Sequence, residues 1–153
     1  MNAFDKLLTC SGMWEGTTRL QFSANEPMHE SPSLIVVTPI LRNTFVRLDQ
    51  TWTWEGKEQL GSMLIGCDPK SEMASLHWID TFHSGLRVMA CKGNFNLHGA
   101  LIVHGSYPAA RGPDWGWRIE IPMINERRIK IDMFNIDPTG KEDGGVWAEF
   151  APE

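Results

Sequence analysis

Along most of the chain, hydrophobic and polar residues alternate with a period of two. From Trp14 to Phe22 every second residue is apolar or small, and the residues between them are polar or charged. This period is typical of β-strands that bury one face. It predicts strands over residues 14–22, 34–41, 44–54, 59–67, 72–82, 86–92, 100–106, 115–123, 127–136 and 141–150.

The one predicted helix covers residues 2–9, before the strands begin. Asn2 is a favourable N-cap, and Phe4, Leu7 and Leu8 fall on one face of a helix. A helix this short needs a surface on which to dock. We therefore expect it to cover one end of a β-barrel.

A Gly-x-Trp-x-Gly motif at residues 12–16 joins this helix to the first strand. Gly12 allows a tight turn of the backbone. Trp14 offers a large apolar ring that is suited to plug one end of a barrel. Gly16 lets the strand bend or approach its neighbour closely.

Turns and loops rich in proline and glycine separate the predicted strands. Residues 23–32 are predicted to form a loop with two prolines, and two Asp-Pro turns lie at 68–71 and 137–140. Pro39 indicates an edge position or a bulge within its strand, and the pair Gly144–Gly145 indicates another bulge. With no helical pattern between the strands, we predict one all-β domain over residues 1–153, an antiparallel barrel of about ten strands.

The later strands indicate which residues face the barrel interior, because charged side chains belong in water unless they are paired. The apolar set that we expect to face inward is Trp117, Ile119, Ile121, Ile129, Ile131 and Met133. The charged set that we expect to face outward is Arg118, Glu120, Arg128, Lys130 and Asp132.

Charge and cysteine content exclude several classes of protein. A net charge of −5 and a pI near 5.5 argue against nucleic-acid partners and against a basic membrane-binding surface. No stretch approaches the roughly 20 apolar residues of a membrane helix, and the opening residues lack the pattern of a signal peptide. Three cysteines without a CxxC spacing predict free thiols, which fit a reducing, cytoplasmic location.

Several segments resemble a known class of barrel. Residues 12–16 resemble the Gly-x-Trp opening of calycins, the superfamily of lipocalins and fatty-acid-binding proteins. Residues 64–70, 76–81 and 135–142 are similar to an uncharacterised bacterial lipocalin-like family of unknown function, although Cys67 replaces its usual Tyr and Thr81 its usual Ser. The resemblance implies a calycin/lipocalin-like barrel with a short N-terminal helix, and it implies no reaction.

Histidine positions argue against haem and metal cofactors. Haem-binding barrels of the nitrobindin type share the Gly-x-Trp-x-Gly opening but use a histidine near the C-terminus, whereas the last histidine here is His104. On one continuous strand Asp80 would point away from His77 and His83, and those two histidines would lie about 20 Å apart. We therefore predict no cofactor and no bound metal.

No catalytic motif occurs in the sequence. It has no Gly-x-Ser-x-Gly elbow, P-loop or dinucleotide fingerprint, and nothing places a base beside a serine or cysteine. We assign no catalytic residue from the sequence. A triad assembled from distant positions stays open, because such sites carry no local signature.

Two polar residues stand on otherwise apolar strand faces. Gln50 interrupts one such face and Asp80 another, so each is either a hydrogen-bonded scaffold residue or the polar group of a cavity. An enclosed Asp80 without a cation would have a raised pKa and could donate a proton, whereas an arginine partner would indicate a structural pair. We predict a ligand-binding cavity formed by Gln50, Trp52, Trp54, Met63, Trp78, Asp80 and Trp117.

Three functions follow from this pattern. The favoured function is a barrel that binds a small apolar or amphipathic molecule. The first alternative is a barrel enzyme that uses Asp80 or a histidine as acid or base. The second alternative is a homodimeric interaction module.

Overall fold

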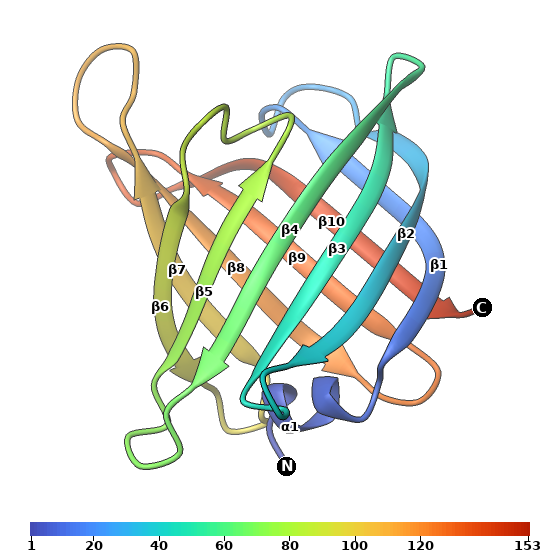
Figure 1. Cartoon of the computed structure of the whole chain (residues 1–153). Coiled ribbons are helices and arrows are strands. Elements are labelled where there is room, and N and C mark those ends of the chain that lie inside the picture. The colour runs from blue at the N-terminus through green and yellow to red at the C-terminus, as the bar shows by residue number, and fades with distance from the viewer.

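Ten antiparallel strands close into a barrel in the computed structural model, which describes all of residues 1–153 (Figure 1). Each strand pairs with its neighbours in the chain, and β1 pairs with β10 to close the sheet. The elements are α1 (Ala3–Leu8), β1 (Gly12–Gln21), β2 (His29–Ile40), β3 (Phe45–Trp54), β4 (Lys57–Cys67), β5 (Ala74–Asp80), β6 (Met89–Phe95), β7 (Leu101–Tyr107), β8 (Trp115–Ile124), β9 (Ile129–Ile136) and β10 (Glu142–Pro152). The predicted all-β antiparallel barrel is confirmed.

Helix α1 covers one end of the barrel, at the bottom of Figure 1, as predicted. Asn2 accepts a hydrogen bond from the Asp5 backbone N–H at 2.9 Å, and the Asp5 carboxylate accepts one from the Asn2 backbone N–H at 3.3 Å. This reciprocal cap stabilises the first turn. The helix buries Ala3, Phe4 and Leu7 against the barrel, so burial rather than helix propensity stabilises it.

Trp14 and Gly16 of the Gly-x-Trp-x-Gly motif have the structural roles that were predicted from the sequence. Trp14 is 5% exposed, and its indole N–H donates to the Cys10 carbonyl at 3.0 Å. Its ring therefore fills the closed end of the barrel beside α1. At Gly16 the backbones of β1 and β10 approach so closely that a Cβ would lie 1.8 Å from the Glu149 carbonyl oxygen.

The predicted inward and outward faces of β8 and β9 are confirmed. The six apolar residues from Trp117 to Met133 that were expected to face inward are all buried, and Ile119, Ile121 and Ile129 have no exposed surface. The five charged residues between them are half-buried or exposed. The interior is one continuous apolar core shared by all ten strands and α1.

Both predicted irregularities occur. The pairing of β10 with β9 shifts between Glu142 and Gly145, as expected of a bulge at the two glycines. Pairing of β1 with β2 ends at Val37, so Pro39 pairs with β3 alone and occupies a local edge. Proline is tolerated there because an edge needs no backbone donor.

Several predicted strand boundaries are wrong by two residues or more, including the following three. Strand β2 begins at His29, inside the expected 23–32 loop, because Pro32 can face outward opposite Thr17 within the ladder. Strand β5 ends at Asp80 rather than at residue 82, and β6 begins at Met89 rather than at residue 86. Hydrophobic residues lie beyond the end of β5 and before the start of β6. The loop between these strands interrupts the pairing, so those residues are not part of either strand.

Candidate functional site

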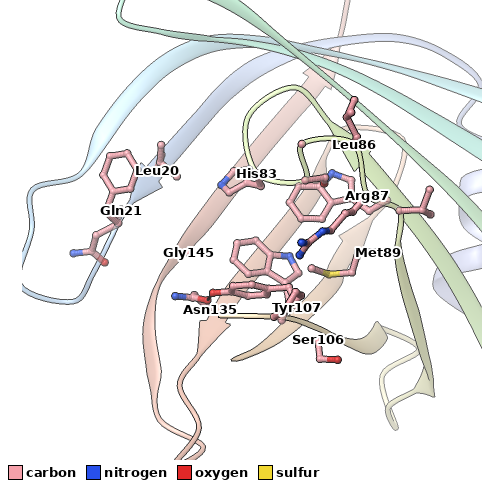
Figure 2. Close-up of a pocket in the computed structure, with 17 residues that line it drawn as sticks. Leu20, Gln21, His83, Leu86, Arg87, Met89, Ser106, Tyr107, Asn135 and Gly145 are labelled. Atoms are coloured by element: carbon pink, nitrogen blue, oxygen red, sulfur yellow. Dashed lines mark hydrogen bonds between the residues drawn. The ribbon is translucent and has the colours of Figure 1, made fainter. Parts of the chain in front are cut away.

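A cavity of about 670 Å³ opens at the end of the barrel opposite α1 (Figure 2). Its walls come from the end of β1, the loop between β5 and β6, the ends of β7 and β9, and the barrel-facing side of β8. The lining residues are Leu20, Gln21, Phe22, Trp78, His83, Ser84, Gly85, Leu86, Arg87, Val88, Met89, Ser106, Tyr107, Pro108, Trp117, Asn135 and Gly145. This size suits a small organic molecule.

Three rings pack together in the wall of the cavity. The indoles of Trp78 and Trp117 stack with their centroids 5.4 Å apart and an interplanar angle of 13°. The imidazole of His83 lies 5.3 Å from Trp78 and 5.5 Å from Trp117. Trp78 and Trp117 are 4% and 6% exposed and belong to the apolar core, so packing fixes the rings that they contribute to the cavity wall.

Asp80 fixes the position of His83. The Oδ1 atom of Asp80 accepts hydrogen bonds from the backbone N–H groups of His83 and Ser84, both at 2.7 Å. Its Oδ2 atom lies 2.7 Å from Nδ1 of His83. The strand interpretation, in which Asp80 and His83 point to opposite faces, is therefore wrong, because a turn after Asp80 folds His83 back onto it.

The Asp80 carboxylate is almost fully enclosed, with 3% of its side chain exposed. Burial alone would raise its pKa, but the His83 ring and the two backbone N–H groups together hold the pKa below its usual range. The condition for a raised pKa and a proton-donor role, an enclosed carboxylate without a cationic partner, is therefore not met, and the partner is a histidine rather than an arginine. Since Asp80 stays ionised, Nδ1 of His83 carries the proton and Nε2 is free for another partner.

A second polar pair lies on the β7 and β9 side of the cavity. The Tyr107 hydroxyl donates to Oδ1 of Asn135, and Nδ2 of Asn135 donates to the Asp143 carbonyl at 3.1 Å. Burial raises the pKa of Tyr107; the Asn135 hydrogen bond opposes this shift, and nearby Asp143 adds to it. Tyr107 is therefore a neutral phenol at physiological pH.

Two lining residues hold buried polar atoms without a hydrogen-bond partner. They are Nε1 of Trp117 and Oγ of Ser84. A buried polar group left without a partner costs roughly 1–3 kcal/mol. An acceptor from a bound molecule would satisfy the Trp117 N–H.

The structure places only part of the sequence-predicted site at this cavity. Trp78 and Trp117 line it. Trp52 and Trp54 lie behind the lining, where each packs on Phe82, at ring distances of 5.0 and 5.7 Å. Trp52 also stacks on His83 at 6.3 Å.

The other three predicted residues have internal partners. Met63 is 3% exposed and pairs with Trp78 across β4 and β5. Gln50 donates to the Thr18 hydroxyl at 2.8 Å, as part of an interior network that includes Ser33. Asp80 lies beneath the loop that it holds, so none of these three contributes to the cavity surface.

Sequence reasoning missed the roles of His83, Arg87, Tyr107 and Asn135. Residues 86–92 looked like a strand, and Arg87 was therefore not considered, although the Ser84–Gly85 turn marks the loop. Tyr107 and Asn135 are 28 residues apart in sequence. No local pattern could have joined them.

Because the Trp117 N–H has no partner, we predict that replacing Trp117 costs less stability than replacing Trp14. Replacing Trp14 by phenylalanine removes the donor to Cys10, whereas replacing Trp117 by phenylalanine removes no hydrogen bond. Trp14→Phe should therefore lower the free energy of unfolding by about 1 kcal/mol more than Trp117→Phe. Urea denaturation of both variants measures the difference, and an equal or larger loss in Trp117→Phe would contradict it.

The structure contains no metal-ligand cluster and no membrane-spanning helix. No three His, Cys, Asp or Glu side chains come together in a way that could hold a metal ion. The single helix is too short to span a membrane. The expectations of no cofactor and of a homodimer as an alternative stay predictions.

A comparison with models of protein families finds one family that matches most of this chain. A family model described as "Protein of unknown function (DUF1579)" matches residues 4–150. No curated protein matches the chain. Among solved structures, a chain described as a candidate thioesterase II from Thermobifida fusca is similar at 9% identity over 99% of this chain and 86% of that chain, with a TM-score of 0.25. A similarity this weak carries no argument.

Proposed function

The chain belongs to the DUF1579 family of proteins of unknown function, and we propose that its barrel binds a small, partly apolar molecule in the cavity opposite α1. We also propose that the barrel is of the calycin type, which residues 12–16 resemble. The observation that carries the binding function is a cavity of about 670 Å³ with a fixed aromatic wall and an unpartnered buried donor. Ligand sites commonly combine an apolar lining with a few placed polar groups.

The residues divide into a contact layer and a supporting layer. Trp78 and Trp117 offer their rings to the ligand, and His83 and Tyr107 offer polar atoms. Behind them, Trp52 and Trp54 support His83 through Phe82, Met63 packs beside Trp78, and Asp80 fixes the His83 ring. In this proposal Gln50 is a structural residue, because its amide joins interior hydroxyl groups.

Tryptophan fluorescence tests the binding function. Titration of the protein with a panel of planar and elongated apolar molecules should change the emission of Trp78 and Trp117, since both indoles lie at the cavity. The change should be at least halved in Trp117→Phe and unaltered in Trp147→Phe. Trp147 packs on Phe134, on the outer side of the barrel, and is the matched control. Equal changes in both variants would place binding elsewhere.

The paired Asp80 and His83 favour an enzyme as a second candidate function. A buried carboxylate that orients a histidine is the arrangement that activates a general base, and His83, which lines the cavity, keeps its Nε2 atom free. In that case His83→Gln would abolish turnover of a bound molecule while lowering its affinity far less. Retained turnover in His83→Gln would leave only the binding function.

A further inference from the structure

We propose that the ligand is a planar aromatic acid, whose carboxylate is bound by the Trp117 indole N–H and the Arg87 guanidinium. This inference rests on the proposed binding function and adds the chemical class of the ligand. Three independent features of the cavity carry it: the type of its unpartnered donor, the sign of its charge, and the shape of its apolar wall.

The unpartnered donor requires an acceptor. Trp117 is 6% exposed, lines the cavity, and has no hydrogen-bond partner for Nε1. An indole N–H can only donate. The ligand group beside it is therefore an acceptor, such as a carboxylate or carbonyl oxygen. Ser84, whose buried hydroxyl also lacks a partner, lines the same cavity and can add a second donor.

The charge of the lining favours an anion. Arg87 is the one side chain with a permanent charge among the 17 lining residues, which include no Asp or Glu, although the whole chain has a net charge of −5. Arg87 forms no ion pair with another residue, and Figure 2 shows its side chain turned inward toward Met89. A guanidinium without a protein carboxylate is available for a carboxylate of the ligand.

A cationic ligand would find no carboxylate partner among the lining residues. The Asp80 carboxylate lies beneath the loop and already accepts three hydrogen bonds from His83 and Ser84, and the Asp143 carboxylate accepts one from the Ala24 backbone N–H. Tyr107 remains a neutral phenol and donates its proton to Asn135. The unpartnered buried groups of the lining, Trp117 Nε1 and Ser84 Oγ, can both donate.

The apolar wall favours a planar ligand. Trp78, Trp117 and His83 form one group of packed rings, and Tyr107 meets Trp117 edge-on at 6.4 Å. At the mouth, Phe22 packs on Trp54 at 5.2 Å and on Phe82 at 6.1 Å. Offset stacking and edge-to-face contacts with such rings favour an aromatic ring over a flexible alkyl chain.

Three probes of similar size separate these features. Isothermal titration calorimetry should show that 2-naphthoate binds about tenfold more tightly than 2-naphthamide, which lacks the charge, because a hydrogen bond to a charged group stabilises more than one to a neutral group. Decanoate, which keeps the charge without the ring, should also bind about tenfold more weakly than 2-naphthoate. The probes are bound by the intact chain, so no variant is needed for this comparison.

Arg87→Met tests the ionic contact. Arg87 is exposed and lies in the loop between β5 and β6, so its replacement leaves the core unchanged. The affinity for 2-naphthoate should fall about tenfold, and the affinity for 2-naphthamide should stay within about twofold. Arg111→Met is the matched control, because Arg111 lies in the neighbouring loop after β7 and does not line the cavity. The control should retain the affinity of the unmodified chain for both probes.

The Trp117 N–H can be observed directly by ¹H–¹⁵N NMR. Its indole resonance is the one that disappears in Trp117→Phe, and 2-naphthoate should shift it downfield as the hydrogen bond forms. Equal affinity for the acid and the amide, or an unchanged indole resonance, would overturn the inference but leave the binding function intact. If decanoate bound more tightly than 2-naphthoate, the inference that the ligand is planar and aromatic would be overturned. No binding of any probe would overturn both the inference and the proposed function for this cavity.

Discussion

Replacing Gly16 by alanine should destabilise the barrel by about 3 kcal/mol or more, enough to leave much of the protein unfolded. A Cβ at this position would lie 1.8 Å from the Glu149 carbonyl oxygen and 2.7 Å from its carbonyl carbon. Both atoms belong to the backbone of β10, so no side chain can rotate away. The two strands would have to separate at the seam where β1 closes the barrel against β10.

Gly116→Ala is the matched control for this expectation. Gly116 also lies in a strand of the barrel, but a Cβ there would meet only Ile136, whose Cβ would be the nearest atom, at 3.4 Å. Its free energy of unfolding should change by less than about 1 kcal/mol. Circular dichroism during thermal and urea denaturation measures both variants. A folded Gly16→Ala protein with unchanged stability would mean that the seam is wider than the structure shows.

Replacing Asp80 by asparagine should have the second largest effect. The carboxylate accepts three hydrogen bonds at 2.7 Å while only 3% of its side chain is exposed. Asparagine offers one acceptor oxygen, and its amide nitrogen cannot accept the proton of His83 Nδ1. The free energy of unfolding at neutral pH should fall by about 2 kcal/mol, because hydrogen bonds to a charged group are lost. Asp114→Asn is the control, since Asp114 is exposed and forms no hydrogen bond in the structure.

The effect of Asp80→Asn depends on pH. The folded state holds the pKa of Asp80 below its value in the unfolded chain, which is about 3.9. The stabilisation by the ionised carboxylate is therefore complete above about pH 4 to 5 and disappears as pH falls through the lower folded pKa. The stability difference between the unmodified chain and Asp80→Asn should be constant near neutrality and shrink in acid. A difference that grows in acid would contradict this linkage.

Asp80→Asn should also alter the cavity. The same three hydrogen bonds fix the turn that carries His83. This turn is the start of the loop that contains Arg87. Loss of ligand affinity together with stability would show that the Asp80 carboxylate positions the site, although it does not line it. Loss of stability with unchanged affinity would make Asp80 a scaffold residue only.

Much of the barrel could be predicted from alternation alone. Inward-facing Ile119, Ile121 and Ile131 and the outward-facing charges between them follow from the two-residue period of a strand, because a shift of one residue would bury the charges. Trp14 could be placed at the closed end because it directly follows the only helix. These are local properties of consecutive residues.

The candidate site could be predicted only in part. Trp78 and Trp117 were expected to wall a cavity because they are large rings on inward faces, and they do line one. The cavity itself, its place at the open end, and the contribution of Arg87 depended on where β5 stops. Hydrophobic residues continue past Asp80 to Phe82, so the pattern alone extended the strand through the turn.

The sequence by itself determined the class of fold and the identity of the core, because alternation and turn residues act over a few neighbouring positions. Only the tertiary structure decided which polar groups meet. It brought His83 back onto Asp80, joined Tyr107 to Asn135, and left one cavity lined by the unpartnered Trp117 N–H and by Arg87, which forms no ion pair. These contacts depend on loop geometry and on the closure of β1 onto β10. Barrel closure sets residues far apart in sequence at fixed distances, and no local pattern records those distances.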